Sequence, residues 1–161
     1  MSDLIAKNPQ FETVVRDSFS RQPFMELIGA RMSDLKPGFC EITLDRDTRL
    51  TQQHGFFHGG LVGSVVDSAA GYAAYSLYPE NSTVLTVDMK VNFLRPADGD
   101  TLIARAQVIH PGGKLYHLKG EAFSVTEGEE KLCMTGVFTM MCLLGVADAT
   151  SLGKDKGRAS T

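Results

Sequence analysis

The chain has 161 residues, of which 43% are hydrophobic and 22% charged, the composition of a globular protein of one domain. Sixteen basic and nineteen acidic residues give a net charge of −3, with no basic block to neutralise phosphates, so we expect no nucleic acid partner. No apolar run could span a bilayer and the first residues lack a secretory signal pattern, so we expect a cytoplasmic protein with no membrane partner.

The first predicted element is a short amphipathic helix near the N-terminus. Asn8 and Pro9 are residue types that suit an N-cap and a first helical position. Apolar residues then recur at helical spacing: Phe11, Val14, Val15 and Phe19. We expect this helix to pack on a larger body.

Residues 30–45 predict a β-hairpin. Two short segments are separated by Pro37 and Gly38, a turn-forming pair. In the second segment apolar and polar positions alternate, so Cys40, Ile42 and Leu44 share one face of the strand.

Residues 58–77 predict a helix that is buried on every side. The stretch "HGGLVGSVVDSAAGYAAYSL" has no proline and no charge except Asp67, and it is rich in Gly, Ala and Ser. A helix that is apolar all round is a core helix, and its small side chains allow other backbones to approach closely. We therefore expect a sheet to wrap around it.

The remainder of the chain predicts an antiparallel meander. Alternating stretches are separated by the turn-like segments "PADGD", "PGGK" and "TEGEE". In residues 83–95 the alternation predicts one apolar face and one polar face. The apolar face would comprise Leu85, Val87, Met89, Val91 and Phe93, and the polar face Thr86, Asp88, Lys90 and Asn92.

These elements predict an α+β fold in which a long central helix is wrapped by a curved antiparallel β-sheet. We expect a single domain over residues 1–143, including the N-terminal helix. Residues 144–161 are small, polar and charged, so we expect a disordered tail there.

The stretch "LTQQHGFFHGGLVGSVVDS" holds the candidate chemistry, and two readings of it are weak. A metal site at His54 and His58 lacks a third ligand, and Gly55 stands where a zinc protease has Glu. A serine hydrolase would need G-x-S-x-G, and no cysteine is paired with a histidine by its spacing. We therefore expect no metal, no cofactor and no cysteine nucleophile.

A third reading is a helix N-terminus at Gly59 and Gly60 that faces a pocket. Its unpaired N–H groups would carry partial positive charge, and residues without side chains let a carbonyl oxygen approach. Asp67 lies further along an otherwise apolar helix. It is either satisfied by hydrogen bonds in a structural role or retained for chemistry, and its burial alone does not decide.

The pattern Q-x-x-G-x-x-H-G-G, with an Asp nine residues after the His and the strand "TVDMKVNFLRPADGD" after the helix, resembles the PaaI-like hotdog-fold acyl-CoA thioesterases (4HBT). The resemblance extends over residues 38–141. It implies a hotdog fold, thioester hydrolysis, an acyl-CoA substrate and a homo-oligomer, a dimer or a homotetramer formed as a dimer of dimers. It also implies an active site at the subunit boundary.

The resemblance assigns roles by position. Asp67 matches the catalytic base or nucleophile, and Gly59 matches the residue whose N–H polarises the thioester carbonyl. Gln52 stands where most PaaI-like members have Asn, which preserves the amide on a longer side chain. The resemblance also implies that Asp67 of one subunit works with Gln52 and Gly59 of its neighbour.

Further residues are assigned to substrate binding. Thr86 matches a hydroxyl position that can orient the attacking water, although an ordinary strand threonine is an equal alternative. His58 and Gly60 belong to the motif, where His58 would stabilise the turn, and His54 would lie at a pocket rim or on the surface. Arg95 and Lys114, next to predicted turns, are candidates for the phosphates of coenzyme A.

The acyl group is not specified by the sequence, and aryl, short and medium-chain groups stay open. Four residues are candidates for the acyl pocket, and core packing explains each equally well: Phe56, Phe57, Val62 and Tyr72. A non-catalytic acyl-CoA-binding protein of the same fold is the alternative function.

Overall fold

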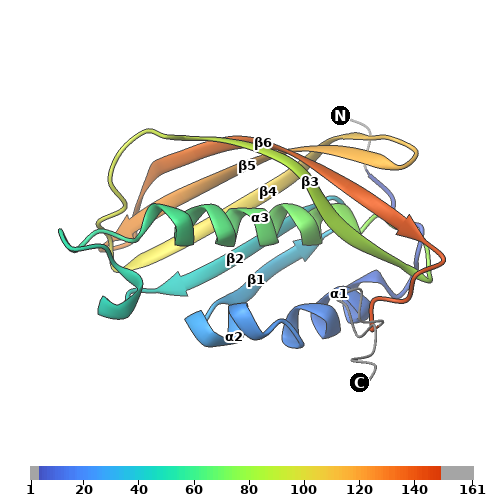
Figure 1. The fold of residues 1–161 in the computed structure, drawn as a ribbon, viewed down its shortest axis with the longest axis horizontal. Coiled ribbons are helices and arrows are strands. Elements are labelled where there is room, and N and C mark those ends of the chain that lie inside the picture. Colours follow the sequence, from blue (N-terminus) through green and yellow to red (C-terminus); the bar gives the residue numbers. More distant parts are fainter. Residues whose placement is uncertain (1–3, 150–161) are drawn as a thin grey trace, which may run out of the picture.

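The computed structural model describes residues 4–149, in which one long helix is wrapped by a six-stranded antiparallel sheet (Figure 1). The long helix is α3 (Gly59–Tyr75), and two shorter helices, α1 (Phe11–Ser20) and α2 (Pro23–Ile28), lie below the sheet in this view. The strands are β1 (Arg31–Lys36), β2 (Phe39–Asp45), β3 (Ser82–Phe93), β4 (Thr101–Pro111), β5 (Leu115–Thr126) and β6 (Glu129–Leu144). This arrangement confirms the predicted α+β fold.

The central helix is covered on nearly all sides, as its lack of charge predicts. It contacts all of the strands β2 to β6. Four alanines of its second half are completely buried: Ala69, Ala70, Ala73 and Ala74. At Gly120 of β5 an added Cβ would lie 2.6 Å from Cγ1 of Val66, so only glycine allows the strand to approach the helix this closely.

The predicted hairpin is confirmed. Strands β1 and β2 are antiparallel neighbours, and Gly38 in the turn has a φ of +77°, a conformation that other residues rarely adopt. Cys40, Ile42 and Leu44 are buried, as the alternation predicts, and they form part of the core under α3.

The predicted meander is correct for β4, β5 and β6 but wrong for β3. The strand order is β1-β2-β4-β5-β6-β3, so β3 pairs with β6 and not with its sequence neighbour β4. The connection of residues 94–100 crosses the end of the sheet and passes the start of α3, where Phe57 N–H donates to the Ala97 carbonyl at 2.9 Å. Strand β3 is consequently an edge strand.

The predicted two faces of β3 are also wrong, because the strand contains a β-bulge between Thr86 and Asp88. A bulge adds one residue and reverses the alternation beyond it. Before the bulge, Val84 packs on the core and Thr86 contacts α3; after it, Val91 and Phe93 lie on that same face. Thr86 therefore faces the helix, on the same side as apolar residues.

The N-terminal helix begins two residues later than Asn8 and Pro9 predict. Asn8 still has a capping role, because its Oδ1 accepts from the N–H of Gln10 at 2.9 Å before α1 starts at Phe11. Val15 of α1 is buried, and the helix contacts both α3 and β1. The predicted packing on a larger body is therefore confirmed.

The expected disordered tail is wrong for its first part. Leu144 belongs to β6, and Asp148 accepts hydrogen bonds from Arg21 at 2.6 Å and from Thr83 at 2.7 Å. These contacts fix residues 145–149 against α1 and β3 (Figure 1). Residues 150–161 lie outside the described part of the chain.

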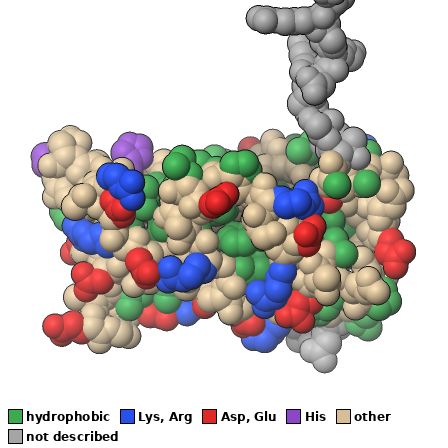
Figure 2. Space-filling model, turned by 90° about the horizontal axis from the view of Figure 1, so that it is seen from below, with side chains coloured by type: hydrophobic (Ala, Val, Ile, Leu, Met, Phe, Trp, Pro, Cys, Tyr) green, Lys and Arg blue, Asp and Glu red, His purple; other side chains and the backbone are tan. Residues whose placement is uncertain are grey.

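On the face viewed from below, basic and acidic side chains alternate with polar and apolar ones (Figure 2). No large surface of one sign is visible on that face, in agreement with the small net charge of −3. None of the helices within residues 4–149 is both long and apolar enough to cross a membrane.

Candidate active site

Helix α3 begins with the motif that the sequence singled out. His58 is its N-cap, and the Nδ1 of its ring accepts from the N–H of Gly60 at 3.0 Å. An added Cβ at Gly60 would lie 3.1 Å from that nitrogen, so the absence of a side chain lets the ring approach closely. The accepting Nδ1 requires a neutral imidazole protonated on Nε2 in this geometry.

The N–H of Gly59 has no hydrogen-bond acceptor among residues 4–149. It belongs to the first turn of α3, where the helix dipole adds positive potential. An added Cβ at Gly59 would lie 3.4 Å from Cζ of Phe93, which is ordinary contact, so packing alone does not demand glycine here. A small residue does leave this N–H open to an approaching oxygen.

Gln52 lies beside Gly59 in a cavity of about 360 Å³ between the start of α3 and the end of β3. Its Oε1 accepts from the backbone N–H of His54, so the amide oxygen is engaged within its own turn. The amide NH₂ is then the group that can donate to a ligand. Four more residues of this cavity were named from the sequence: Phe56, Phe57, Val62 and Arg95.

Asp67 lies two turns further along α3, half-buried, in a second cavity of about 330 Å³. Its Oδ1 accepts from the hydroxyl of Thr86 at 2.9 Å. Burial raises the pKa of Asp67 above its ordinary value of 3.8, and the Thr86 hydrogen bond lowers it in part. The carboxyl is thus a stronger base than a solvated aspartate.

One protomer does not bring the two sets of residues together. Gly59 and Asp67 are eight residues apart on α3, which is about 12 Å along a helix. Gln52, Gly59 and Arg95 line one cavity, while Asp67, Thr86 and Tyr72 line the other.

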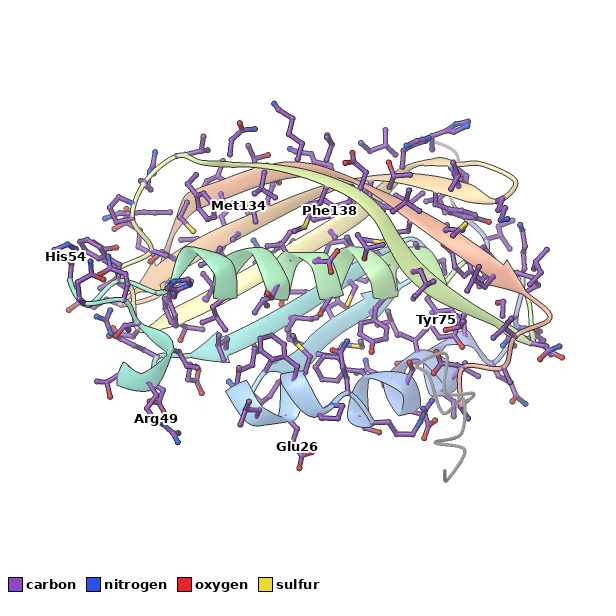
Figure 3. All side chains as sticks on the ribbon, in the orientation of Figure 1. Glu26, Arg49, His54, Tyr75, Met134 and Phe138 are labelled. Atoms are coloured by element: carbon purple, nitrogen blue, oxygen red, sulfur yellow. The ribbon has the colours of Figure 1, made fainter. Side chains whose placement is uncertain are left out.

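His58 and Gly60 line a third cavity, of about 1080 Å³, on another side of the helix start. His54 is exposed at the outer tip of the loop before α3, where Figure 3 shows it away from the body of the molecule. The structure thus places His54 on the surface, at a distance from Asp67.

The two predicted phosphate-binding residues lie at opposite ends of the sheet. The N–H of Arg95 donates to the Cys133 carbonyl at 3.4 Å, and the Lys114 carbonyl accepts from Cys142 at 2.9 Å. Cys133 and Cys142 are nine residues apart on β6, about 30 Å along a strand. Arg95 and Lys114 could bind the same phosphate group only if they came from different protomers.

The sequence analysis missed the residues that the end of α1, the link between α1 and α2 and the C-terminal segment contribute to the Asp67 cavity. These residues are Ser18, Arg21, Gln22 and Asp148. Ser18 and Arg21 are three residues apart at the end of α1, a spacing that could have placed them on one face. Asp148 had no such signal, because its position depends on where the chain runs after β6.

Comparison with known proteins identifies relatives of this chain. The family model of the thioesterase superfamily matches residues 54–131. A solved structure of a thioesterase family protein from Silicibacter pomeroyi is 48% identical with a TM-score of 0.82, covering 84% of this chain and 99% of that one. A protein of Pasteurella multocida (strain Pm70) is 30% identical over 102 residues, which are 63% of this chain and 71% of its own.

The acyl-coenzyme A thioesterase PaaI of Escherichia coli (strain K12) is 33% identical over 86 residues, 53% of this chain and 59% of PaaI. A solved structure of E. coli PaaI has a TM-score of 0.76 at 22% identity and covers 88% of this chain and 99% of that one, a similarity that shows the fold. The chain therefore belongs to the thioesterase superfamily, as a PaaI-like thioester hydrolase with the hotdog fold.

Proposed function

We propose that this protein is an acyl-CoA thioesterase whose active site combines Asp67 of one protomer with Gly59 and Gln52 of another. The observation that carries this proposal is the separation of the two sets along α3. A base and an oxyanion donor about 12 Å apart cannot act on one carbonyl carbon. A dimer would therefore contain two sites, and each protomer would supply Asp67 to one site and Gly59 with Gln52 to the other.

The exposed edge strand β3 supports pairing of two protomers. Four large apolar side chains on it are about half exposed: Leu85 (44%), Val87 (52%), Met89 (51%) and Phe93 (54%). A long apolar edge strand with unpaired N–H and C=O groups is a template for another strand. A second copy of β3 would satisfy these groups and cover the apolar side chains.

Antiparallel pairing of two β3 strands would also join the two halves of the site. Within one protomer, Asp67 is bonded to Thr86 near the start of β3, and Gly59 lies against Phe93 at its end. A two-fold axis near Met89 and Lys90 would set Phe93 of one protomer against Thr86 of its partner. Gly59 of one chain would then approach Asp67 of the other.

In the general-base mechanism, Asp67 takes a proton from water while the water oxygen bonds to the thioester carbonyl carbon. The carbonyl oxygen becomes an oxyanion and accepts from the N–H of Gly59, at the positive end of α3. The C–S bond then breaks, the thiolate of CoA leaves and takes up a proton, and the free acid forms. Thr86 orients the Asp67 carboxylate throughout.

In the nucleophilic mechanism, an Asp67 oxygen itself bonds to the carbonyl carbon, the C–S bond breaks and the CoA thiolate leaves, and water hydrolyses the resulting mixed anhydride. The raised pKa of Asp67 suits either role, because it makes the carboxylate more basic. Single turnover in ¹⁸O water tests for the anhydride. Label in Asp67 indicates an anhydride opened by water at the Asp67 carbonyl, whereas the general-base mechanism never labels Asp67.

The substrate would be an aryl-CoA or a short or medium-chain acyl-CoA. The cavity at Asp67, about 330 Å³, is at the lower end of the roughly 300–1,000 Å³ of small-molecule pockets. Arg95 lines the cavity at Gly59 and is available to a CoA phosphate from there. The other residues predicted to bind substrate line neither of these two cavities: His58, Gly60 and Lys114.

Thiol release from acetyl-, hexanoyl-, phenylacetyl- and hydroxybenzoyl-CoA tests the activity. We expect turnover by the wild type and a kcat lower by about 10²- to 10⁴-fold in Asp67→Asn, the usual contribution of acid–base catalysis. Asp34→Asn is the matched control, since Asp34 is an exposed carboxylate paired with Lys36 outside these cavities. A folded, fully active Asp67→Asn variant would refute the proposal.

A further inference from the structure

We infer that the ion pair between Arg21 and Asp148 is the end wall of the acyl pocket and limits the length of the acyl group that the enzyme accepts. This inference rests on the proposed function. The thioester carbon must lie beside Asp67, and the CoA moiety is large and charged. The acyl group is therefore the part of the substrate that enters the small cavity lined by Asp67.

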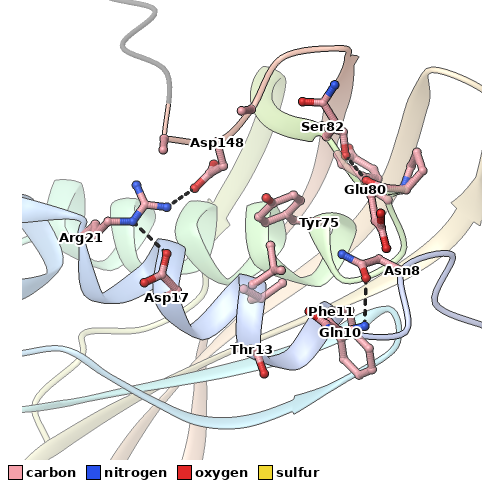
Figure 4. A pocket seen from close by; sticks show the side chains of 17 residues that line it. Asn8, Gln10, Phe11, Thr13, Asp17, Arg21, Tyr75, Glu80, Ser82 and Asp148 are labelled. Carbon is pink, nitrogen blue, oxygen red and sulfur yellow. Dashed lines mark hydrogen bonds and ion pairs between the residues drawn. The ribbon is translucent and has the colours of Figure 1, made fainter.

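Another cavity, here called the rear cavity, lies directly behind the Asp67 cavity. It has a volume of about 520 Å³ and is bounded by α1, by the end of α3 and by the C-terminal segment (Figure 4). Arg21 and Asp148 line both cavities, and no other described residue does so. The ion pair therefore stands at the boundary between the Asp67 cavity and the larger space behind it.

The wall is held in place from several sides. Arg21 donates from one terminal nitrogen (Nη2) to Asp148 at 2.6 Å and from its Nε to Asp17 at 3.0 Å. Asp148 also accepts from the hydroxyl of Thr83 at 2.7 Å, which anchors it to β3. Two of these contacts are drawn in Figure 4. Two elements of the fold, α1 through Asp17 and β3 through Thr83, thus restrain the pair.

The chemistry of the wall opposes a long apolar chain. The side chain of Asp148 is 17% exposed, so an alkyl end that reached it would strip solvent from a charged group without giving a hydrogen bond. The cavity behind the wall has a mixed lining, with polar residues of α1 and of residues 80–82 at its edges and apolar side chains that an alkyl chain could contact. That lining includes Phe11, Val14, Val15, Tyr75, Tyr78 and Pro79.

The test is the double variant Arg21→Ala/Asp148→Ala, which removes both charges of the wall and leaves only the carboxylate of Asp17, which is exposed, without its partner. We measure kcat/KM on a series of saturated acyl-CoA substrates from acetyl to decanoyl. We expect the ratio of decanoyl to butyryl activity to rise by at least about tenfold, the lower end of what one methylene contributes in an apolar pocket. Adding Val14→Phe should fill part of the rear cavity, the one behind the wall, and return the ratio of decanoyl to butyryl activity toward the wild-type value.

Arg16→Ala is the matched control, because Arg16 forms an ion pair with Glu12 on the same helix and lines neither cavity. Its acyl-length profile should equal that of the wild type. If the double variant does not fold, Asp148→Ser shortens the wall, keeps a hydroxyl next to Thr83 and should raise the same ratio.

Two outcomes overturn the inference. A folded, active double variant with the wild-type ratio shows that the ion pair only fastens the C-terminal segment to α1. A raised ratio that Val14→Phe does not reverse shows that the chain takes another route. Failure of the proposed function is separate from both, because it appears as no thiol release by the wild type with any acyl-CoA.

Discussion

At the scale of single residues, the environment of Asp67 sets two opposing demands. Burial favours the protonated carboxyl and raises its pKa, while the hydroxyl of Thr86 stabilises the carboxylate at 2.9 Å and lowers it. Hydrolysis needs the ionised form, because only the carboxylate can take a proton or attack carbon. In the proposed function Thr86 is therefore a positioning residue, and its loss should be visible in the pH profile.

Thr86→Val removes the hydroxyl and keeps the shape of the side chain. The pKa of Asp67 should rise further, so the acid limb of kcat/KM should move to higher pH than in the wild type. Thr86→Ser retains a hydroxyl and should restore the wild-type midpoint. Initial rates between pH 4 and 9 measure this, and coincident profiles for Thr86→Val and wild type would rule out the role.

Asp67 should also reduce the stability of the fold at neutral pH. Its folded-state pKa lies above the unfolded value of 3.8, so the native state binds the proton more tightly. The contribution of Asp67 to the free energy of unfolding is therefore fully present below pH 3.8 and is lost as pH rises through the folded-state pKa. Asp67→Asn should be more stable than wild type at pH 7, with the difference disappearing at acid pH; urea unfolding at both pH values measures it.

At the scale of elements, the start of α3 combines a structural cap with the N–H that we propose as the oxyanion donor. The Nδ1 of His58 satisfies the N–H of Gly60, and the N–H of Gly59 stays open. A cap that paired both groups would stabilise the helix more but leave no donor for an oxyanion. The glycine pair and the His58 cap thus belong to one arrangement.

His58→Ala should lower the free energy of unfolding by about 1 kcal/mol, the usual cost of a lost N-cap. His58→Asn should recover most of this loss, since asparagine is among the preferred N-cap residues. His54→Ala is the control, because His54 is exposed in the adjacent loop. Equal stabilities for the two alanine variants, measured by chemical denaturation, would contradict the capping role.

At the scale of the whole molecule, the proposed function needs a second protomer to cover the apolar edge β3 and to complete the divided site. Light scattering should give at least twice the 17.5 kDa of one chain. Met89→Lys places a charge in the middle of the proposed β3 contact, where it opposes strand pairing. We expect this variant to dissociate and to lose activity together, because neither half-site is complete alone.

Ile109→Lys is the matched control for this experiment. Ile109 on β4 is 61% exposed and Met89 is 51% exposed, so both changes place lysine on an exposed apolar position of the sheet. Only Met89→Lys should lower the molecular mass measured by light scattering, and Ile109→Lys should keep the wild-type mass. An active monomer of either the wild type or Met89→Lys would refute the shared site.

The sequence by itself determined the features that depend on local pattern. The small, uncharged residues of α3 predicted a buried helix, and the alternation around Ile42 predicted the hairpin, because periodicity reports which side of an element faces the core. The spacing of Gln52, Gly59 and Asp67 identified the candidate site, since all three belong to one loop and the helix that follows it.

Only the tertiary structure decided the features that depend on distant contacts. Strand β3 pairs with β6 at a separation of some fifty residues, and its bulge turned Thr86 toward Asp67 against the simple alternation. Asp148 meets Arg21 across 127 residues, so no local pattern could place them together beside the catalytic candidate. Pairing between strands and closure of a cavity are set by the packing of the whole chain, which local periodicity does not encode.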